Sequence, residues 1–439
     1  MSKKRLSDRG SVKKLLFRSN EQPLTVLVLG LQAVCMLLLT FRGGSFRFSA
    51  LLMAAVIPAA AYTVLKLISD KWHADRVLYL LTVFLAGLGI ILLSALYPAN
   101  DRAVTQCLYL GAGYVAMMLG IVIARHFSGS ERILKLAAFC SLGFACLPFA
   151  FPAGGSARIW VRMGGMQFQP AELLKPVTVF ILSAFFAVGG RSARRAFWGA
   201  AYGAAMCGIL VLQKDLGGVC LYFLTTAALF AAGTHRRKIT LIGLAVTAVL
   251  AVILITQIDK FPRFNYAAER IDIWKDPWNS TSENAPQIQQ GLISIASGGL
   301  VGSGLSLSYA RKVAVVASDY IFAALSEEFG VLFSLSVIAV YLVILLRGIW
   351  TACCARSKFS ALVCFGCVFE LTVQMLLIVP GNLNIIPLTG VTLPFISEGG
   401  SSLTACMMMM GLILGVSSLN AEDEADALQK LPAAKGARR

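Results

Sequence analysis

The chain alternates between long apolar runs and shorter polar segments. Each run is close to the roughly 20 residues that a helix needs to cross the hydrocarbon core of a bilayer. The runs begin around Leu24, Phe48, Val77, Val104, Ile133, Leu173, Phe197, Asp215, Ile239, Tyr320, Lys358 and Ser402. The pattern therefore predicts an all-α polytopic membrane protein with about twelve spanning helices.

The basic residues set the orientation of these helices. Cytoplasmic loops carry the excess of Lys and Arg in membrane proteins. Alternate loops of this chain hold the basic clusters, namely Lys3, Lys4, Arg5, Lys13 and Lys14, then Lys71 and Arg76, Arg125 and Arg132, Arg191, Arg194 and Arg195, Arg236, Arg237 and Lys238, and Arg347, Arg356 and Lys358. Both termini are therefore expected in the cytoplasm.

Composition supports the membrane class and removes several alternatives. Hydrophobic residues make up 57% of the chain, charged residues 14%, and the mean hydropathy is +0.75, which excludes a soluble domain of this length. The net charge of +17 fits the topology signal and attraction to anionic lipid head groups, so no nucleic-acid partner is expected. His73, His126 and His235 fall in inner loops, and the cysteines lie almost wholly in predicted spans or inner loops, where no disulfide framework is expected.

Three long segments lie on the predicted outer side, at 151–172, 259–318 and 380–401. Functional groups concentrate on loops that a rigid scaffold holds in place. The third segment is rich in Pro and Gly inside an apolar region, which predicts a bent backbone buried in protein or lining a wet cavity. We therefore look for a site where these three segments meet.

The first outer segment has two interpretations. Arg158 and Arg162 flank Trp160, and Glu172 and Lys175 stand one helical turn apart. The arginines and Lys175 would suit an anionic phosphate. Alternatively, the arginines and Trp160 anchor the chain at the membrane interface and Glu172 pairs with Lys175.

Asp319 ends the second outer segment, immediately before an apolar helix that also contains Glu327 and Glu328. Carboxylates this close to a bilayer are costly unless they are paired or hydrated, so three within ten residues favour a polar cavity. The alternative is an Asp that only stabilises the start of a helix through its dipole. The Gly-rich stretch 297–304 lacks the strand and the Gly-Lys-Ser ending of a nucleotide-binding loop.

Several short motifs, taken in order, resemble the SEDS family (shape, elongation, division and sporulation) of FtsW and RodA over about residues 75–418. The motifs are Phe168-Gln169-Pro170-Ala171-Glu172, Gln213 with Asp215-Leu216-Gly217, Asp276-Pro277, Gln287 with Gln290, Ser297-Gly298-Gly299-Leu300 with Gly302 and Gly304, Ser318-Asp319-Tyr320-Ile321-Phe322 with Glu327-Glu328-Phe329-Gly330, and Pro394-Phe395-Ile396-Ser397 with Gly399-Gly400-Ser401-Ser402. The resemblance implies a ten-helix core. It divides the chain into a basic cytoplasmic tail at 1–22, an extra helical pair at 23–74, the core at 75–420 with its large extracellular loop at 259–318, and a second cytoplasmic tail at 421–439.

The resemblance also implies a function. A member of this family would be a peptidoglycan glycosyltransferase of the bacterial cytoplasmic membrane that polymerises lipid II at the outer face, in elongation, division or sporulation. It would work with a class B penicillin-binding protein and with other divisome or elongasome proteins. The residue regarded as catalytic in the family aligns with Asp319.

The expected chemistry is an inverting transfer that forms a β-1,4 bond, with Asp319 as general base and cations at the pyrophosphate leaving group. No cofactor is certain, although a divalent cation such as Mg²⁺ would help. The candidate substrate-binding residues are Arg158, Trp160, Arg162, Gln169, Glu172, Lys175, Asp215, Arg270, Gln287 and Ser397.

Some residues depart from the family pattern. Lys214 stands where Pro is usual, Ala171 replaces Ser, and Glu398 replaces a usual Tyr beside the expected pyrophosphate site. Glu370 has no assigned role. Two other functions stay open: a lipid II flippase, which would need polar groups along a path across the membrane, and a non-catalytic scaffold for a penicillin-binding protein, in which Asp319 would be dispensable.

Overall fold

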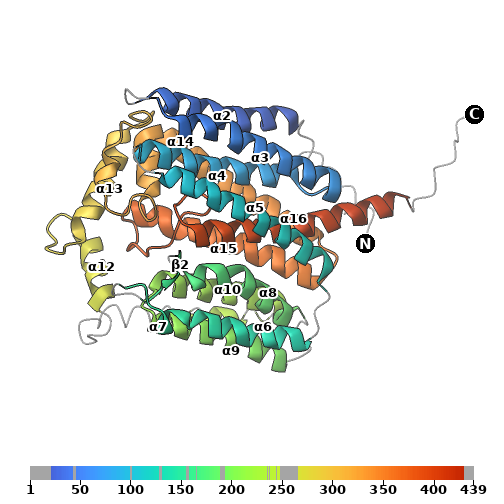
Figure 1. Cartoon of the computed structure of the whole chain (residues 1–439). Helices are drawn as coiled ribbons and strands as arrows, with labels where there is room; N and C mark the ends of the chain where they lie inside the picture. Colours follow the sequence, from blue (N-terminus) through green and yellow to red (C-terminus); the bar gives the residue numbers. More distant parts are fainter. Residues whose placement is uncertain are drawn as a thin grey trace, which may run out of the picture.

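The structure is a computed structural model that describes residues 21–42, 46–98, 101–127, 131–154, 158–164, 166–187, 193–234, 236, 238–243, 245–247 and 265–429. Its long helices run side by side in one bundle (Figure 1). In the first half these are α2 (Glu21–Phe41), α3 (Phe48–Trp72), α4 (Arg76–Leu96), α5 (Arg102–His126), α6 (Glu131–Ala145), α7 (Leu147–Ala150), α8 (Pro170–Phe186), α9 (Ala193–Leu212) and α10 (Leu216–Thr234). The second half has α12 (Asn265–Lys275), α13 (Ala285–Gly298), the 3₁₀ helix η4 (Tyr309–Lys312), α14 (Ile321–Cys354), α15 (Lys358–Asn382) and α16 (Gly400–Gln429).

Ten of the described helical segments are long and apolar enough to cross a membrane. Of the other two predicted spans, α8 is shorter, at 17 residues, and the one from Ile239 lies partly outside the described residues. The count of twelve therefore stays a prediction, as does the cytoplasmic location of the tails. The tail at 1–22 lies almost wholly outside the described residues, and α16 continues to Gln429, so the second tail begins as helix.

A small hairpin is the exception to the all-α prediction. Strands β1 (Val161–Met163) and β2 (Met166–Phe168) pair antiparallel in the first outer segment. Val161 is buried while its neighbour Arg162 is exposed, the alternation that a strand imposes on successive side chains.

Close glycine contacts bring α5 and α16 together in the centre of the bundle. A Cβ at Gly411 of α16 would lie 2.1 Å from the carbonyl oxygen of Met117, and one at Gly120 of α5 would lie 2.6 Å from that of Met408. Apolar side chains gain little from meeting each other in lipid, so small residues that allow close backbone approach are how such helices pack.

The N-terminal pair α2 and α3 covers one side of α4 (Figure 1). Two buried polar contacts fix it there: Gln32 Nε2 donates to the Val83 carbonyl at 2.8 Å, and the Tyr79 hydroxyl donates to the Ala61 carbonyl at 2.7 Å. As a result α4 is among the most buried helices of the bundle. The pair is therefore seated by specific bonds as well as by apolar contact.

Two ends of the bundle can be distinguished. At the end we call the loop end, α12 and α13 lie across the bundle, whereas the C-terminal part of α16 extends beyond the opposite end (Figure 1). At that opposite end Asp75 caps α4 by accepting from the Val77 and Leu78 amides, and Arg347 Nη2 approaches its carboxylate at 2.7 Å. Both side chains are largely buried, so this ion pair ties α4 to α14.

Helix α14 is interrupted at Gly330, where φ is +83° and ψ is 170°. The interruption is bonded to the segment that follows α13: the Val331 amide donates to the Gly299 carbonyl at 3.0 Å, and the Ser303 amide to the Glu327 carbonyl at 2.8 Å. The Glu327 carboxylate accepts from the Ser308 hydroxyl and from the Tyr309 and Ala310 amides at the start of η4. The first part of α14 is thus joined to the loop end by its own polar groups.

Residues 383–399, the α15–α16 loop, have no regular structure, yet Val391, Leu393, Phe395 and Ile396 in them are buried. The predicted bent backbone inside the protein is therefore confirmed. Gln106 of α5 holds the loop by donating to the Ser397 carbonyl at 3.1 Å and accepting from the Gly399 amide at 3.2 Å. Such irregular backbone is tolerated among membrane helices where its polar groups find partners in the protein.

Candidate active site

Asp319 lies at the loop end, two residues before α14, in a half-buried position. Arg270 of α12 reaches the same place: its Nη1 donates to the Thr389 carbonyl at 3.2 Å. Both side chains lie close to Gly390, since a Cβ there would be 3.6 Å from Asp319 Oδ2 and 3.8 Å from Arg270 Nη2. A Cβ would make only ordinary contacts with them, but the φ of +73° at Gly390 disfavours any side chain at this position.

The surroundings shift the protonation of Asp319 in opposing directions. Burial disfavours the charged form and raises the pKa of the Asp319 carboxyl above its ordinary value, while a hydrogen bond from Ser318 and the charge of Arg270 act to lower it. A carboxylate with a raised pKa is suited to accept a proton.

Asp215 is brought to the neighbouring turn between α9 and α10. Its Oδ1 accepts from the Gly218 amide at 2.8 Å, and a Cβ at Gly217 would be 2.6 Å from the Thr389 carbonyl oxygen. Burial raises the pKa of the Asp215 carboxyl, with the Gly218 amide as the largest opposing contribution. The α15–α16 loop thus meets both the turn that carries Asp215, at Gly217, and Arg270.

The Lys214 departure has a structural reason. Lys214 has φ of +66°, which proline cannot adopt because its ring fixes φ near −65°. Its ammonium lies 5.8 Å from the centroid of the Tyr266 ring on α12. The turn therefore has a different backbone from one built on Pro and contributes a further contact to α12.

Arg158 and Arg162 are both exposed on the first outer segment, and Trp160 between them is half-buried. The Arg158 amide donates to the Gln213 carbonyl at 3.1 Å, which ties this segment to the Asp215 turn. Among the residues that the structure describes, no carboxylate lies within ion-pair distance of either guanidinium. Both arginines are therefore available to an anion.

Glu172 and Lys175 form a buried pair in α8. Lys175 is 3% exposed, and its Nζ lies 2.7 Å from both carboxylate oxygens of Glu172. The structure therefore agrees with the second interpretation of these residues, in which Glu172 pairs with Lys175. Glu370, which the sequence left without a role, lies in the same bundle interior, where its carboxylate accepts from the Thr225 hydroxyl.

The remaining candidates differ in how free their side chains are. Gln287 is half-buried on α13, one turn before Gly291, which packs against the Tyr320 ring. The main-chain amide of Gln169 donates to the Ser401 hydroxyl at 3.2 Å. Ser397 is buried, and its hydroxyl both donates to the Ser318 carbonyl at 2.7 Å and accepts from the Leu393 amide at 2.8 Å. These bonds connect the α15–α16 loop to the residue before Asp319.

The structure also adds residues that the sequence analysis did not propose for the site. Asn382 contacts the main chain at Asp319, and Arg102 pairs with Glu398 at 3.2 Å while lying 4.3 Å from the centroid of the Tyr97 ring. The Arg102 pair neutralises the charge that Glu398 introduces. The one signal in the sequence was that Asn382 and Glu398 are polar residues in an apolar stretch.

A metal finds few protein ligands in the described part of the chain. No group of three or more His, Cys, Asp or Glu side chains there could hold a metal ion. Magnesium in phosphate-transfer sites often needs only one or two carboxylates, with substrate oxygens and water as its other ligands. A divalent cation therefore stays a prediction.

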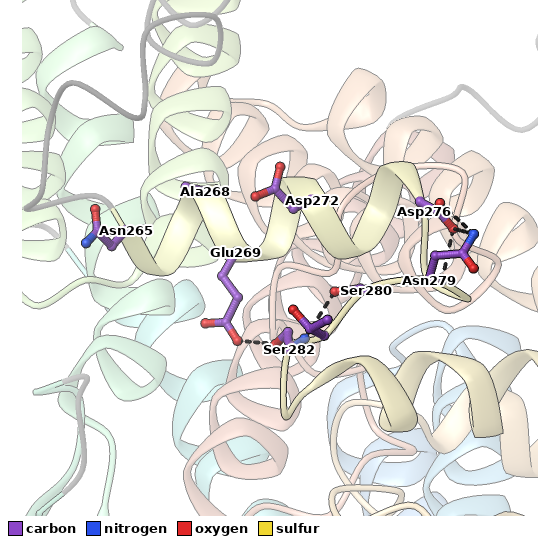
Figure 2. A pocket seen from close by; sticks show the side chains of 9 residues that line it. Asn265, Ala268, Glu269, Asp272, Asp276, Asn279, Ser280 and Ser282 are labelled. Carbon is purple, nitrogen blue, oxygen red and sulfur yellow. Dashed lines mark hydrogen bonds between the residues drawn. The ribbon is translucent and has the colours of Figure 1, made fainter.

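A separate open pocket lies on α12, away from Asp319. It is lined by Asn265, Ala268, Glu269, Asp272, Asp276, Asn279, Ser280, Thr281 and Ser282 (Figure 2). Figure 2 shows Glu269 reaching Ser282 and Asp276 reaching Asn279, whereas no bond is drawn to Asp272. Neither Asp319, Arg270 nor the α15–α16 loop contributes to its lining, so we do not assign the reaction to it.

Known proteins resemble this chain over most of its length. The peptidoglycan glycosyltransferase RodA of Mycobacterium leprae (strain TN) is 27% identical over 373 residues, covering 79% of this chain and 78% of that protein. The stage V sporulation protein E of Bacillus subtilis (strain 168) is 28% identical, covering 80% of this chain and 98% of that protein. The probable peptidoglycan glycosyltransferase FtsW of Thiomicrospira cyclica is 30% identical, covering 79% and 94%.

Solved structures show the same fold. A chain of a peptidoglycan synthase complex that coordinates polymerization and crosslinking has a TM-score of 0.63 at 24% identity, covering 80% of this chain and 99% of that one. The rod shape determining protein RodA of Thermus thermophilus has a TM-score of 0.58 at 23% identity, covering 79% and 98%. The family model described as a cell cycle protein of the FtsW, RodA and SpoVE type matches residues 76–422. The match covers most of the chain and leaves α2 and α3 outside it, and the protein therefore belongs to the FtsW, RodA and SpoVE family.

Proposed function

We propose that this protein is a peptidoglycan glycosyltransferase that polymerises lipid II at the outer face of the bacterial cytoplasmic membrane. Relatives that carry this activity in their names match about four fifths of the chain. The observation that carries the proposal is that the half-buried Asp319 carboxylate and the Arg270 guanidinium both lie close to Gly390, with the charge of Arg270 acting on Asp319. A base and a cation side by side are what transfer from a pyrophosphate-linked sugar requires.

In the proposed reaction Asp319 takes the proton of the acceptor sugar's 4-hydroxyl. The freed oxygen forms a bond to the anomeric carbon of the donor sugar from the face opposite the leaving group. The bond between that carbon and the pyrophosphate oxygen breaks, and its electron pair leaves with the pyrophosphate. The configuration inverts, which gives a β-1,4 linkage from an α-linked donor.

The exposed guanidiniums are the proposed partners of the leaving group. Arg270 is closest to Asp319, and Arg158 and Arg162 lie on the neighbouring outer segment without a described ion-pair partner. A guanidinium matches phosphate oxygens with two parallel hydrogen bonds. Lys175 could contribute only if its pair with Glu172 opened, because its ammonium is buried.

The other candidates keep different roles in the proposal. Trp160, Gln169, Asp215 and Gln287 stay predicted substrate-binding residues at the loop end. The Ser397 hydroxyl already has two partners, so we place it among the residues that position Asp319. A class B penicillin-binding protein is the proposed partner, since the reaction supplies glycan strands for crosslinking.

A flippase is the second candidate function, and one observation favours it. Glu172, Lys175 and Glu370 place ionisable groups inside the bundle, as a transport path would require. The two carboxylates and the ammonium are packed among helices, whereas Arg158, Arg162 and Arg270 are exposed at the loop end beside the candidate base. A polymerisation assay and a flipping assay on the same preparation separate the two functions.

The test uses purified protein with its cognate penicillin-binding partner and lipid II. We expect Asp319→Asn and Asp319→Ala to lose about 10²- to 10⁴-fold in polymerisation rate, the usual contribution of a general base. Asp272→Asn is the matched control, because this exposed carboxylate lies on α12 in the separate pocket (Figure 2). Undiminished polymerisation by folded Asp319 variants would remove Asp319 from the chemistry, and a wild type that moves lipid II without polymerising it would favour the flippase.

A further inference from the structure

Three successive main-chain carbonyls at the candidate base are held by residues from one other part of the chain. The Ala317 carbonyl accepts from the Glu398 amide at 2.8 Å. The Ser318 carbonyl accepts from the Ser397 hydroxyl at 2.7 Å, and the Asp319 carbonyl from Asn382 Nδ2 at 2.7 Å. All three donors belong to the end of α15 or to the α15–α16 loop.

Asn382 makes the most specific of these contacts. Besides donating to the Asp319 carbonyl, it accepts from the Ala323 amide through Oδ1 at 3.2 Å. In a regular helix the amide of residue 323 would bond to the carbonyl of residue 319. The Asn382 side-chain amide therefore replaces one helical hydrogen bond. Its Nδ2 bonds to the Asp319 carbonyl and its Oδ1 to the Ala323 amide, the two groups that would bond to each other in a regular helix.

The consequence is a defined start for α14. Ala323 and Ala324 both donate to the Tyr320 carbonyl, and the helix begins at Ile321, so Asp319 remains outside it. Asn382 is 1% exposed, which shields its bonds from competition with water. The orientation of the Asp319 backbone is thus fixed by a side chain 63 residues further along the chain.

We propose that Asn382 is a positioning residue for the reaction: its amide, together with the Ser397 hydroxyl, holds the main chain at Asp319 so that the carboxylate meets the acceptor hydroxyl. This rests on the proposed function of Asp319. Asn382 acts through Asp319 and does not touch substrate. A base must lie within hydrogen-bond reach of its proton, and a displacement of about 1 Å can cost about 10²-fold in rate.

The principal test compares Asn382→Leu and Asn382→Asp with the wild type. Leu removes both bonds at similar volume, whereas Asp keeps an acceptor for the Ala323 amide but replaces the donor to the Asp319 carbonyl. We expect kcat for lipid II polymerisation to fall about 10- to 100-fold in both, with KM changed less than about threefold, since the substrate contacts are untouched. Asn382→Asp should also move the acid limb of the pH–rate profile upward, because a negative charge close to Asp319 disfavours its ionisation.

Asn420→Leu is the matched control. Asn420 makes the same kind of bond, Nδ2 to the Thr351 carbonyl at 2.9 Å, but at the opposite end of the bundle. It should lower the melting temperature without the loss of kcat. Equal losses of kcat in the Asn420 and Asn382 variants, or normal kcat in folded Asn382→Leu, would overturn the proposal.

Ser397 provides a second route if the Asn382 variants do not fold. Ser397→Ala removes the donor to the Ser318 carbonyl, while Ser397→Thr retains a hydroxyl. A kcat that is lowered in Ser397→Ala and restored in Ser397→Thr would support the proposal. An equal kcat in the two variants would oppose it.

Amide hydrogen exchange separates this proposal from the proposed function. Faster exchange at Ala323 in Asn382→Leu than in wild type or Asn420→Leu reports loss of the contact itself, whatever the activity. Faster exchange in Asn382→Leu combined with a normal kcat would contradict the positioning role even if Asp319 were essential, because the contact would be lost without effect on the base. Polymerisation that survives in Asp319→Asn would instead refute the proposed function while leaving the exchange result intact.

Discussion

Arg270 and Asp319 come from segments 49 residues apart, and each is held by main-chain contacts at the loop end. Arg270 donates to the Thr389 carbonyl, and both charged groups lie close to Gly390. In the proposed reaction the pyrophosphate binds Arg270, whose charge favours the ionised form of Asp319, so we expect binding of the leaving group and ionisation of the base to be coupled. This coupling can be measured through pH dependence.

The raised pKa of Asp319 predicts how the rate depends on pH. A general base works in its ionised form, so kcat/KM should fall as pH is lowered through the Asp319 pKa, at a higher pH than for an ordinary aspartate. Arg270 opposes the rise, and Arg270→Gln should therefore move this acid limb to still higher pH. The measurement is the pH–rate profile of polymerisation in both proteins.

Lys275→Gln is the control for this prediction, since Lys275 is exposed at the end of the same helix. Its profile should coincide with that of the wild type. An acid limb that stays in place in Arg270→Gln would mean that the guanidinium does not influence the base.

At the scale of elements, the interruption of α14 determines the geometry of the loop end. A continuous helix of 34 residues would be about 51 Å long at 1.5 Å per residue, well beyond the thickness of a hydrocarbon core. The break at Gly330 lets the first part of α14 bond to residues 299–304 instead. Asp319 precedes this first part, so its position depends on the break.

Gly330→Ala should therefore be strongly destabilising. The backbone there has φ of +83°, and a Cβ would lie 2.4 Å from the Leu300 carbonyl oxygen, so both strain and overlap oppose any side chain. We expect a loss of at least about 2 kcal/mol in the free energy of unfolding, measured by thermal or denaturant unfolding in detergent.

Gly111→Ala is the comparison at a helical glycine with open space, because no atom lies within 4 Å of a Cβ there. It should be neutral or slightly stabilising, given the higher helix propensity of Ala. Similar melting temperatures for the two variants would show that the break tolerates a side chain.

At the scale of the whole molecule, α2 and α3 lie before the part of the chain that the family match covers. The family match begins at residue 76, after α2 and α3. Besides apolar packing, Gln32, Tyr79 and Arg47 join the pair to the core, the last through a bond to the Ser94 carbonyl at 3.1 Å. None of the candidate site residues has a hydrogen bond or ion pair to a described residue of α2 or α3.

Deletion of residues 1–74 should therefore preserve polymerisation and lower thermal stability. The bonds from Gln32 and Arg47 would be lost, while lipid would replace much of the apolar contact. Activity, melting temperature and co-purification of the penicillin-binding partner are the three measurements. Loss of partner co-purification with normal activity would support a docking role for α2 and α3, whereas unchanged co-purification would argue against that role. Loss of activity in a folded deletion variant would contradict the expectation that the candidate active site does not depend on these two helices.

The sequence by itself determined the membrane class, most of the spanning helices, the irregular third outer segment and the family. These follow from information that is local in the chain: the length of apolar runs, the density of Pro and Gly, and short motifs. The sequence also singled out Asp319, since a carboxylate at the start of an apolar helix is costly unless something compensates for it.

Only the tertiary structure decided which partner each buried polar group bonds to. From the sequence, the partner of Lys175 was either a phosphate or Glu172. In the structure α8 packs into the bundle and buries Lys175 as a pair with Glu172. Asn382 and Ser397 are bonded to the main chain at Ser318 and Asp319, and Arg102 neutralises Glu398. These contacts join segments 63 to 296 residues apart. No local pattern encodes them, because which hydrogen-bond partner a buried group finds depends on how the helices pack.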